Sequence, residues 1–207
     1  MAFHLIDLEQ WDRKEYYEHY AKKVRCGYSI TVHLDISTLV NERLYPAMLW
    51  LLTDTVNEHQ AFRYTNSSGQ VGFFDDMHPS YTIFNHENKN FSVIWTEFHQ
   101  EYNIFLSNYE KDVAQYSCSR TLAPKSEKPA NTFDVSMIPW VPFSSMNLNL
   151  YDGADYLSPI FTMGQIFKEN GRTRLPLAIQ VHHAVCDGYH VGMFLQSLQE
   201  KLFYWKK

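Results

Sequence analysis

Cysteine, long hydrophobic runs and excess positive charge are all scarce in this sequence. Its 207 residues include three cysteines, an odd number that cannot pair completely within one chain. No stretch approaches the roughly eighteen consecutive apolar residues that a membrane-spanning helix needs. Lysine plus arginine total 18 against 23 aspartate plus glutamate, which gives a net charge of −5. Strong non-specific binding to nucleic acid is therefore excluded, because it needs a clustered positive field.

The sequence also shows no repeat of fixed period, no low-complexity tract and no signal peptide in Met1–Leu8. We therefore expect Cys26, Cys118 and Cys186 to stay reduced in a cytoplasmic setting. Apolar residues make up 45% and charged residues 20%, so general disorder is excluded. Aromatic residues reach 16%, which suits flat ligand pockets or large subunit contacts. We predict a single domain over residues 1–207.

Hydrophobic periodicity predicts a mixture of helices and strands. A helix is expected from Asp12, which forms a capping-box-like start with Glu15, to about Val24. Tyr28–Ile36 alternates apolar and polar residues, as in a strand with one buried face. Ser117–Asn131 is expected to be a surface loop. Further strands are expected at Phe62–Thr65, Val71–Phe74, Tyr81–Phe84, Phe91–Trp95, Phe133–Ile138, Met146–Leu150, Leu157–Met163 and Leu175–His183, and further helices from Pro46, within Glu97–Tyr116 and over Val191–Leu202. This mixture indicates a mixed sheet covered by helices.

The segment Gln180–Gly188, with the sequence QVHHAVCDG, follows an apolar strand and precedes a helix. The ends of strands that face a crevice are where α/β proteins place reactive groups. His182 and His183 are adjacent on a strand and point to opposite faces, so only one of them enters a given site. Histidine is the usual general base near neutral pH, and we expect the other histidine, His182, to be structural.

Other interpretations of this segment stay open from the residues alone. Asp187 fits an N-cap of the final helix. His182, His183, Cys186, Asp187 and His190 are all potential metal ligands. The two adjacent histidines diverge and no second zinc-type cluster is present, so we predict no metal site. A nucleophilic role for Cys186 is disfavoured, because the neighbouring Asp187 raises the thiol pKa.

This motif and seven further segments resemble the chloramphenicol acetyltransferase family. HHAVCDG follows PLAIQV as in the family signature. The other segments keep the family order over nearly the whole chain: WDRKEYY, RCGYS, LYPAM, PSYTIF, FDVSMIPW, MNLN and SPIFTMG. H-x-x-x-D-G alone is shared with dihydrolipoyl acetyltransferases and condensation-type acyltransferases, whereas the full set is specific. The resemblance implies an α/β two-layer sandwich in which helices cover a mixed β-sheet, the CoA-dependent acyltransferase fold.

The implied reaction is direct transfer of an acetyl group from acetyl-CoA, a co-substrate, to the primary 3-hydroxyl of chloramphenicol, which inactivates the antibiotic. His183 matches the general base, whose ring binds its own backbone carbonyl in the family. Ser136 matches the serine that stabilises the oxyanion, and Thr162 matches a threonine that helps to hold a water. Asp187 matches an acid that pairs with an arginine, here Arg13, in a structural clamp.

The resemblance also implies the walls of the two substrate pockets. The drug pocket maps onto Tyr20, Cys26, Tyr28, Phe91 and Leu148. The CoA channel maps onto Trp140 and Tyr45. Tyr28 and Asp134 depart from relatives that carry Phe and Asn at these positions. The family is a homotrimer with active sites at subunit interfaces, and it implies no nucleic-acid or membrane partner and no permanently bound cofactor.

Three alternatives remain at this stage. One is acyl transfer to another acceptor such as lipoamide, although dihydrolipoyl acetyltransferases carry lipoyl and peripheral-subunit domains that this sequence does not contain. Another is a non-catalytic homologue that binds phenicol or CoA, although such a binder is expected to lose one of the site residues. The third is a purely structural trimer.

Overall fold

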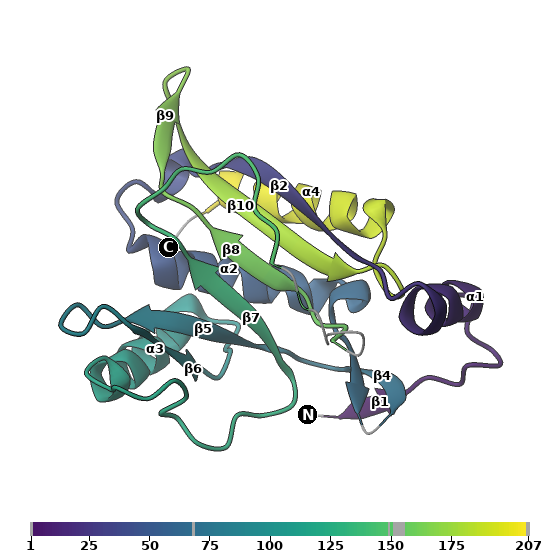
Figure 1. Ribbon diagram of the computed structural model, residues 1–207. Coiled ribbons are helices and arrows are strands. Elements are labelled where there is room, and N and C mark those ends of the chain that lie inside the picture. The colour runs from purple at the N-terminus through teal and green to yellow at the C-terminus, as the bar shows by residue number, and fades with distance from the viewer. Residues whose placement is uncertain (1, 68, 149, 151–155, 206–207) are drawn as a thin grey trace.

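The computed structural model describes residues 2–67, 69–148, 150 and 156–205, and its main feature is a mixed β-sheet (Figure 1). The sheet has the strand order β2–β10–β8–β7–β5–β6, with β9 paired to β10. Its strands are β2 (Gly27–Asp35), β5 (His78–Phe84), β6 (Phe91–Trp95), β7 (Thr132–Met137), β8 (Ile160–Met163), β9 (Phe167–Glu169) and β10 (Arg172–His182). The β5–β7 and β7–β8 pairs are parallel, and the others are antiparallel. The predicted mixed sheet is thus confirmed.

Helices cover one face of this sheet. The three long ones are α2 (Leu44–Glu58), α3 (Tyr102–Tyr116) and α4 (Gly188–Phe203). In Figure 1 they lie together behind the strands. The short α1 (Lys14–Tyr17) continues into one turn of π-helix at Glu18–Lys23, and its N-cap Arg13 meets Asp187 at the start of α4. The remaining elements are two 3₁₀ turns (Ser37–Leu39 and Gln60–Phe62) and a small antiparallel sheet of β1 (Phe3–Leu5), β4 (Gln70–Phe74) and β3 (Tyr64–Ser67).

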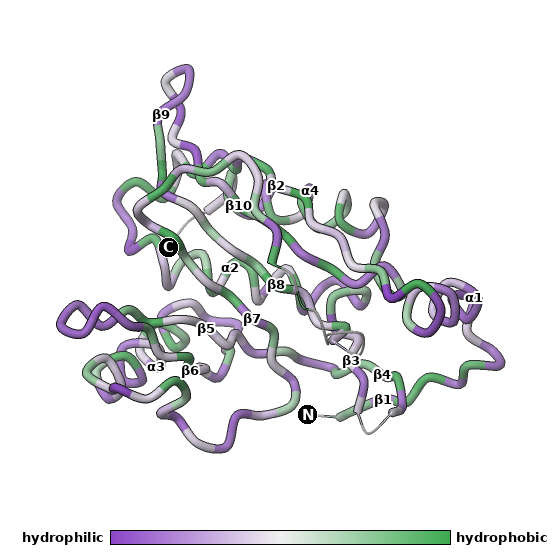
Figure 2. The backbone as a smooth tube through the Cα atoms, in the orientation of Figure 1, coloured by the Kyte–Doolittle hydropathy of each residue, from purple (hydrophilic) through white to green (hydrophobic). Residues whose placement is uncertain are grey.

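The core lies between the helices and the sheet. Leu175, Leu177, Ile179 and Val181 alternate along β10, and each is at most 3% exposed. Phe161, which pairs with Ile179, stacks on the α4 side, with its ring centroid 5.4 Å from that of Phe194. Figure 2 shows hydrophilic residues gathered at turns such as the tip of the β9–β10 hairpin. The alternation of apolar residues along β10 thus places Leu175, Leu177, Ile179 and Val181 on the sheet face that the helices cover.

The opposite face of the sheet carries polar side chains. The segment after β7 passes over it, because the Met146 amide donates to Thr31 Oγ1 (3.2 Å) and the Leu148 amide to Gln180 Oε1 (2.9 Å). The strand predicted at Met146–Leu150 is wrong for its described residues, and Asn149 of that segment lies outside them. Both edges of β10 are occupied by β2 and β8, so this segment packs on the sheet face instead of joining it.

Several boundaries also differ from the sequence expectations. The Asp12 capping box is wrong: Arg13 is the N-cap of α1, without a side-chain cap, and its guanidinium is directed to Asp187. The helix expected within Glu97–Tyr116 begins only at Tyr102, since the Phe98 amide binds the His78 ring (3.0 Å). The strand β2 is an edge strand, and its apolar face is only partly buried.

Candidate active site

The turn between β10 and α4 carries the histidine pair. The His183 amide donates to the carbonyl of Cys26 (2.9 Å), and this bond ties the turn to the start of β2. His182 is buried, and its Nδ1 accepts from the Ala184 amide (3.2 Å), which shapes the turn. The structure thus places His183 beside Cys26 and gives the ring of His182 a local backbone contact.

Two tyrosines hold the His183 imidazole. The Tyr20 ring is stacked on it with 4.1 Å between centroids and 2° between planes. The Tyr28 ring meets it edge-on at 5.2 Å. His183 Nδ1 is buried and has no hydrogen-bond partner in the described part of the chain. The expected bond from this ring to its own carbonyl is therefore not formed, and aromatic contacts orient the imidazole instead.

A widened helical turn brings Tyr20 to the imidazole. The π-helix Glu18–Lys23 closes with a hydrogen bond from the Val24 amide to the His19 carbonyl (2.9 Å). The Cys26 amide then returns to the Tyr20 carbonyl (3.0 Å), so helix and strand meet at this ring. Single π-turns are frequent at functional sites. No sequence pattern predicted this turn.

Asp187 serves both as a helix cap and as an ion-pair partner. Its Oδ1 accepts from the Tyr189 amide (3.1 Å), and its Oδ2 accepts from Arg13 Nη1 (2.9 Å). His190 Nδ1 lies 2.8 Å from Oδ1. Burial raises the pKa of the Asp187 carboxyl, but the bonds from Arg13 and His190 outweigh it and hold this pKa at about 2. The predicted clamp is thus present, and His190 is a partner that sequence reasoning missed, although its position three residues after the cap marks a capping box.

A second group of predicted residues lies in the middle of the sheet. Ser136 on β7 and Thr162 on β8 are register partners, and their hydroxyl oxygens are 3.0 Å apart. Thr162 also pairs with Ala178 on β10, whereas His183 lies five residues further along the chain. At about 3.3 Å per residue, His183 is about 16 Å from the Ser136–Thr162 pair along the sheet. Within this chain, the predicted base therefore does not reach the predicted oxyanion donor.

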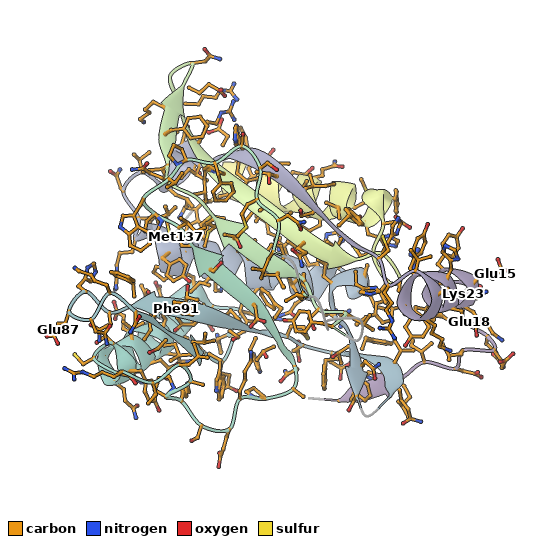
Figure 3. The ribbon with its side chains drawn as sticks, in the orientation of Figure 1. Glu15, Glu18, Lys23, Glu87, Phe91 and Met137 are labelled. Carbon is orange, nitrogen blue, oxygen red and sulfur yellow. The ribbon has the colours of Figure 1, made fainter. Side chains whose placement is uncertain are left out.

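The remaining predicted residues gather near this second group. Phe91 is 53% exposed and pairs with Phe84 across β6 and β5, and Trp140, 60% exposed, packs edge-on against Phe84 at 5.0 Å. The Tyr45 hydroxyl donates to the Thr82 carbonyl of β5 (3.0 Å). Figure 3 shows Phe91 at the opposite side of the molecule from the α1 segment marked by Glu18 and Lys23. Leu148 lies between the groups, over Gln180.

The predicted site residues thus form two sets. The His183 set contains Arg13, Tyr20, Cys26, Tyr28, His183 and Asp187. The Ser136 set contains Tyr45, Phe91, Ser136, Trp140 and Thr162. Each set occupies its own region of the sheet, with Leu148 between them.

The other candidate chemistry of this turn finds no support. Burial, reinforced by the charge of Asp187, raises the pKa of the Cys186 thiol to about 12, so the thiol is protonated at neutral pH. Cys26, Cys118 and Cys186 are all free. In the described ranges, no group of three or more histidine, cysteine, aspartate or glutamate side chains is arranged to hold a metal. A separate point concerns membranes: no helix in the described part of the chain is both long enough and apolar enough to cross a bilayer.

Comparisons with known proteins identify the family and the fold of this chain. A sequence model of the chloramphenicol acetyltransferase family matches residues 1–199. Chloramphenicol acetyltransferases from Clostridium perfringens and Vibrio anguillarum are 46% and 49% identical to this chain, each over 97% of it and 94% of the relative. A solved chloramphenicol acetyltransferase structure matches 97% of this chain and 100% of its own, with a TM-score of 0.87 at 20% identity, so it shows the same acyltransferase fold. The chain belongs to the chloramphenicol acetyltransferase family.

Proposed function

We propose that this protein transfers the acetyl group of acetyl-CoA to the primary hydroxyl of chloramphenicol and so inactivates the antibiotic. The observation that carries the proposal is the His183 imidazole, oriented by Tyr20 and Tyr28 in a family member. With Nδ1 buried, Nε2 is the nitrogen that can reach a substrate hydroxyl. The three cysteines of the protein are all free, which fits the reducing cytoplasm expected from the sequence.

The reaction needs one proton acceptor and one oxyanion donor. His183 Nε2 takes the proton of the drug hydroxyl while its oxygen attacks the thioester carbonyl, and general-base help of this kind contributes about 10²–10⁴-fold. The Ser136 hydroxyl donates to the oxyanion of the tetrahedral intermediate, which is worth on the order of 10²–10³-fold. Collapse of the intermediate breaks the C–S bond, and the CoA thiolate recovers the proton from the imidazolium.

Thr162 has a supporting role in this scheme. Its hydroxyl lies 3.0 Å from that of Ser136 and fixes the rotamer of the donor. In the family the matching threonine also helps to hold a water. The drug ring would lie against Tyr20, Cys26, Tyr28, Phe91 and Leu148, and the coenzyme against Trp140 and Tyr45.

We also propose that the active protein is a homotrimer whose sites lie between subunits. The separation of His183 from Ser136 within one protomer supports this, because a neighbour must supply the second group. The half-buried Ser136 on the sheet face opposite the helices supports it as well, since a second copy can approach its hydroxyl.

Mixed assemblies test the shared site. His183→Ala and Ser136→Ala should each lose most of the activity when expressed alone. When they are co-expressed, some interfaces should contain both wild-type residues and regain part of the activity. No recovery in assemblies shown to contain both variants would place the whole site within one chain and contradict the shared-site proposal.

Thiol release from acetyl-CoA tests the reaction itself. We expect release that depends on chloramphenicol, that produces the acetylated drug, and that disappears in His183→Ala. Release with dihydrolipoamide but not with chloramphenicol would assign another acceptor. Tight chloramphenicol binding without release would indicate a non-catalytic homologue, and neither binding nor release would refute the proposal.

A further inference from the structure

Lys128, Asp134 and Tyr156 form a network that joins three segments of the chain. Asp134, on β7, accepts from the Tyr156 hydroxyl at Oδ2 (2.6 Å). Its Oδ1 pairs with Lys128 Nζ (3.1 Å). Lys128 comes from the loop between α3 and β7, and Tyr156 lies just before β8. The network therefore links two loops to the strand that carries Ser136.

The position of Asp134 places a negative charge near the proposed oxyanion. Asp134 and Ser136 are two residues apart on β7, so their side chains leave the same sheet face about 7 Å apart. A carboxylate at that distance repels an oxyanion held by the Ser136 hydroxyl. A cation paired with Asp134 offsets this repulsion.

Tyr156 does not supply this compensation. Burial, together with the neighbouring Asp134 carboxylate, raises the pKa of the Tyr156 hydroxyl well above its usual range. The hydroxyl stays protonated at neutral pH and donates one neutral hydrogen bond. Among the described residues, Lys128 is the cation paired with Asp134.

We propose that Lys128 is a positioning residue for the acetyl transfer, which acts by neutralising Asp134 so that the oxyanion can form at Ser136. This inference rests on the proposed function, because it needs the oxyanion role of Ser136. Lys128 acts through Asp134 and does not contact the reacting atoms. Substitution of Lys128 should therefore change kcat and leave KM unchanged. The oxyanion that Asp134 repels exists only after the drug hydroxyl has attacked the thioester.

A charge-based cycle tests the network. Lys128→Met leaves Asp134 uncompensated, and two unit charges about 7 Å apart, partly screened by solvent, change a rate by on the order of tenfold. We expect Lys128→Met to lower kcat about tenfold. Asp134→Asn keeps an oxygen for Tyr156 but leaves the lysine charge, so its kcat should equal or exceed the wild-type value. The double variant should return to within about twofold of wild type.

Controls separate charge from structure. Lys201→Met removes a paired lysine in the helix layer, where it binds Asp54 and Glu58, and should leave kcat unchanged. Lys128→Arg preserves the charge and should preserve kcat. Salt should shrink the deficit of Lys128→Met, because it screens the exposed charge.

The outcomes are distinct. A structural role of the network predicts that Lys128→Met and Asp134→Asn both lower kcat, and that result, or a double variant as slow as Lys128→Met, overturns the inference. If Lys128→Met does not fold, the direction in which Asp134→Asn changes kcat decides between a charge role and a structural role. Wild-type protein without chloramphenicol-dependent thiol release refutes the proposed function, whereas normal release with the wrong pattern in the cycle refutes only the role of Lys128.

Discussion

Replacing Asp187 removes two kinds of interaction, its charge contacts with Arg13 and His190 and its N-cap bond, whose contributions can be separated. The pKa of its carboxyl falls from the ordinary 3.8 to about 2 in the folded protein. Each unit corresponds to about 1.4 kcal/mol, so burial of the carboxyl and its bonds with Arg13 and His190 together leave a net contribution of about 2 kcal/mol to stability at neutral pH. The side chains of Arg13 and Asp187 are 17% and 30% exposed, which limits solvent screening of the pair. The N-cap bond to the Tyr189 amide adds about 1 kcal/mol.

Two substitutions separate these contributions. Asp187→Asn keeps an N-cap oxygen but loses the charge, and it should lower the free energy of unfolding by about 2 kcal/mol. Asp187→Ala loses both interactions and should lower it by about 3 kcal/mol, near the lower end for a broken buried pair. Both variants should also lower acetyl transfer, because both lose the ion pair with Arg13 that holds the end of the His183 turn. Urea unfolding at one fixed protomer concentration measures stability, and thiol release measures activity.

The same pair predicts a dependence on pH. The folded-state pKa is lower than the unfolded one, so the stabilisation is complete above about pH 4 and is lost as pH falls toward about 2. The difference in free energy of unfolding between wild type and Asp187→Asn should be constant from pH 7 to 5 and should decrease below pH 4. An Asp187→Asn variant that loses activity but unfolds like wild type would refute the clamp and leave a purely catalytic role.

Three further outcomes are expected. Tyr20→Ala should lower kcat about threefold to tenfold because the stack on His183 is lost, whereas Tyr20→Phe keeps the ring and should stay near wild type; equal losses would contradict stacking as the cause. Tyr28→Phe removes a buried hydroxyl that has no hydrogen-bond partner among the described residues, so the variant should be equally or more stable in thermal unfolding. A clear drop in Tm would show that the hydroxyl does have a partner. Iodoacetamide should label exposed Cys118 but not buried Cys186 in the folded protein, and mass spectrometry of the labelled peptides would expose the opposite result.

Local patterns predicted the regular elements well. The alternation in β2 and β10 and the helical spacing in α2 and α4 agree with the structure, because burial of one face imposes those periods on the residues. The strand expected at Met146–Leu150 failed because strand pairing depends on a free edge elsewhere in the sheet. The π-turn at Glu18–Lys23 was missed because no residue pattern marks an i→i+5 bond.

The family was determined by the sequence alone, because the motif around His183 and seven ordered segments are local and specific, and the same segments predict the site residues. Only the tertiary structure decided which of those residues meet. It brought Arg13 to Asp187 across 174 positions, and it separated His183 from Ser136 along the sheet. The reason is physical: residue types follow from chemistry that is written locally, whereas distances depend on strand order and register, which arise when the whole chain packs.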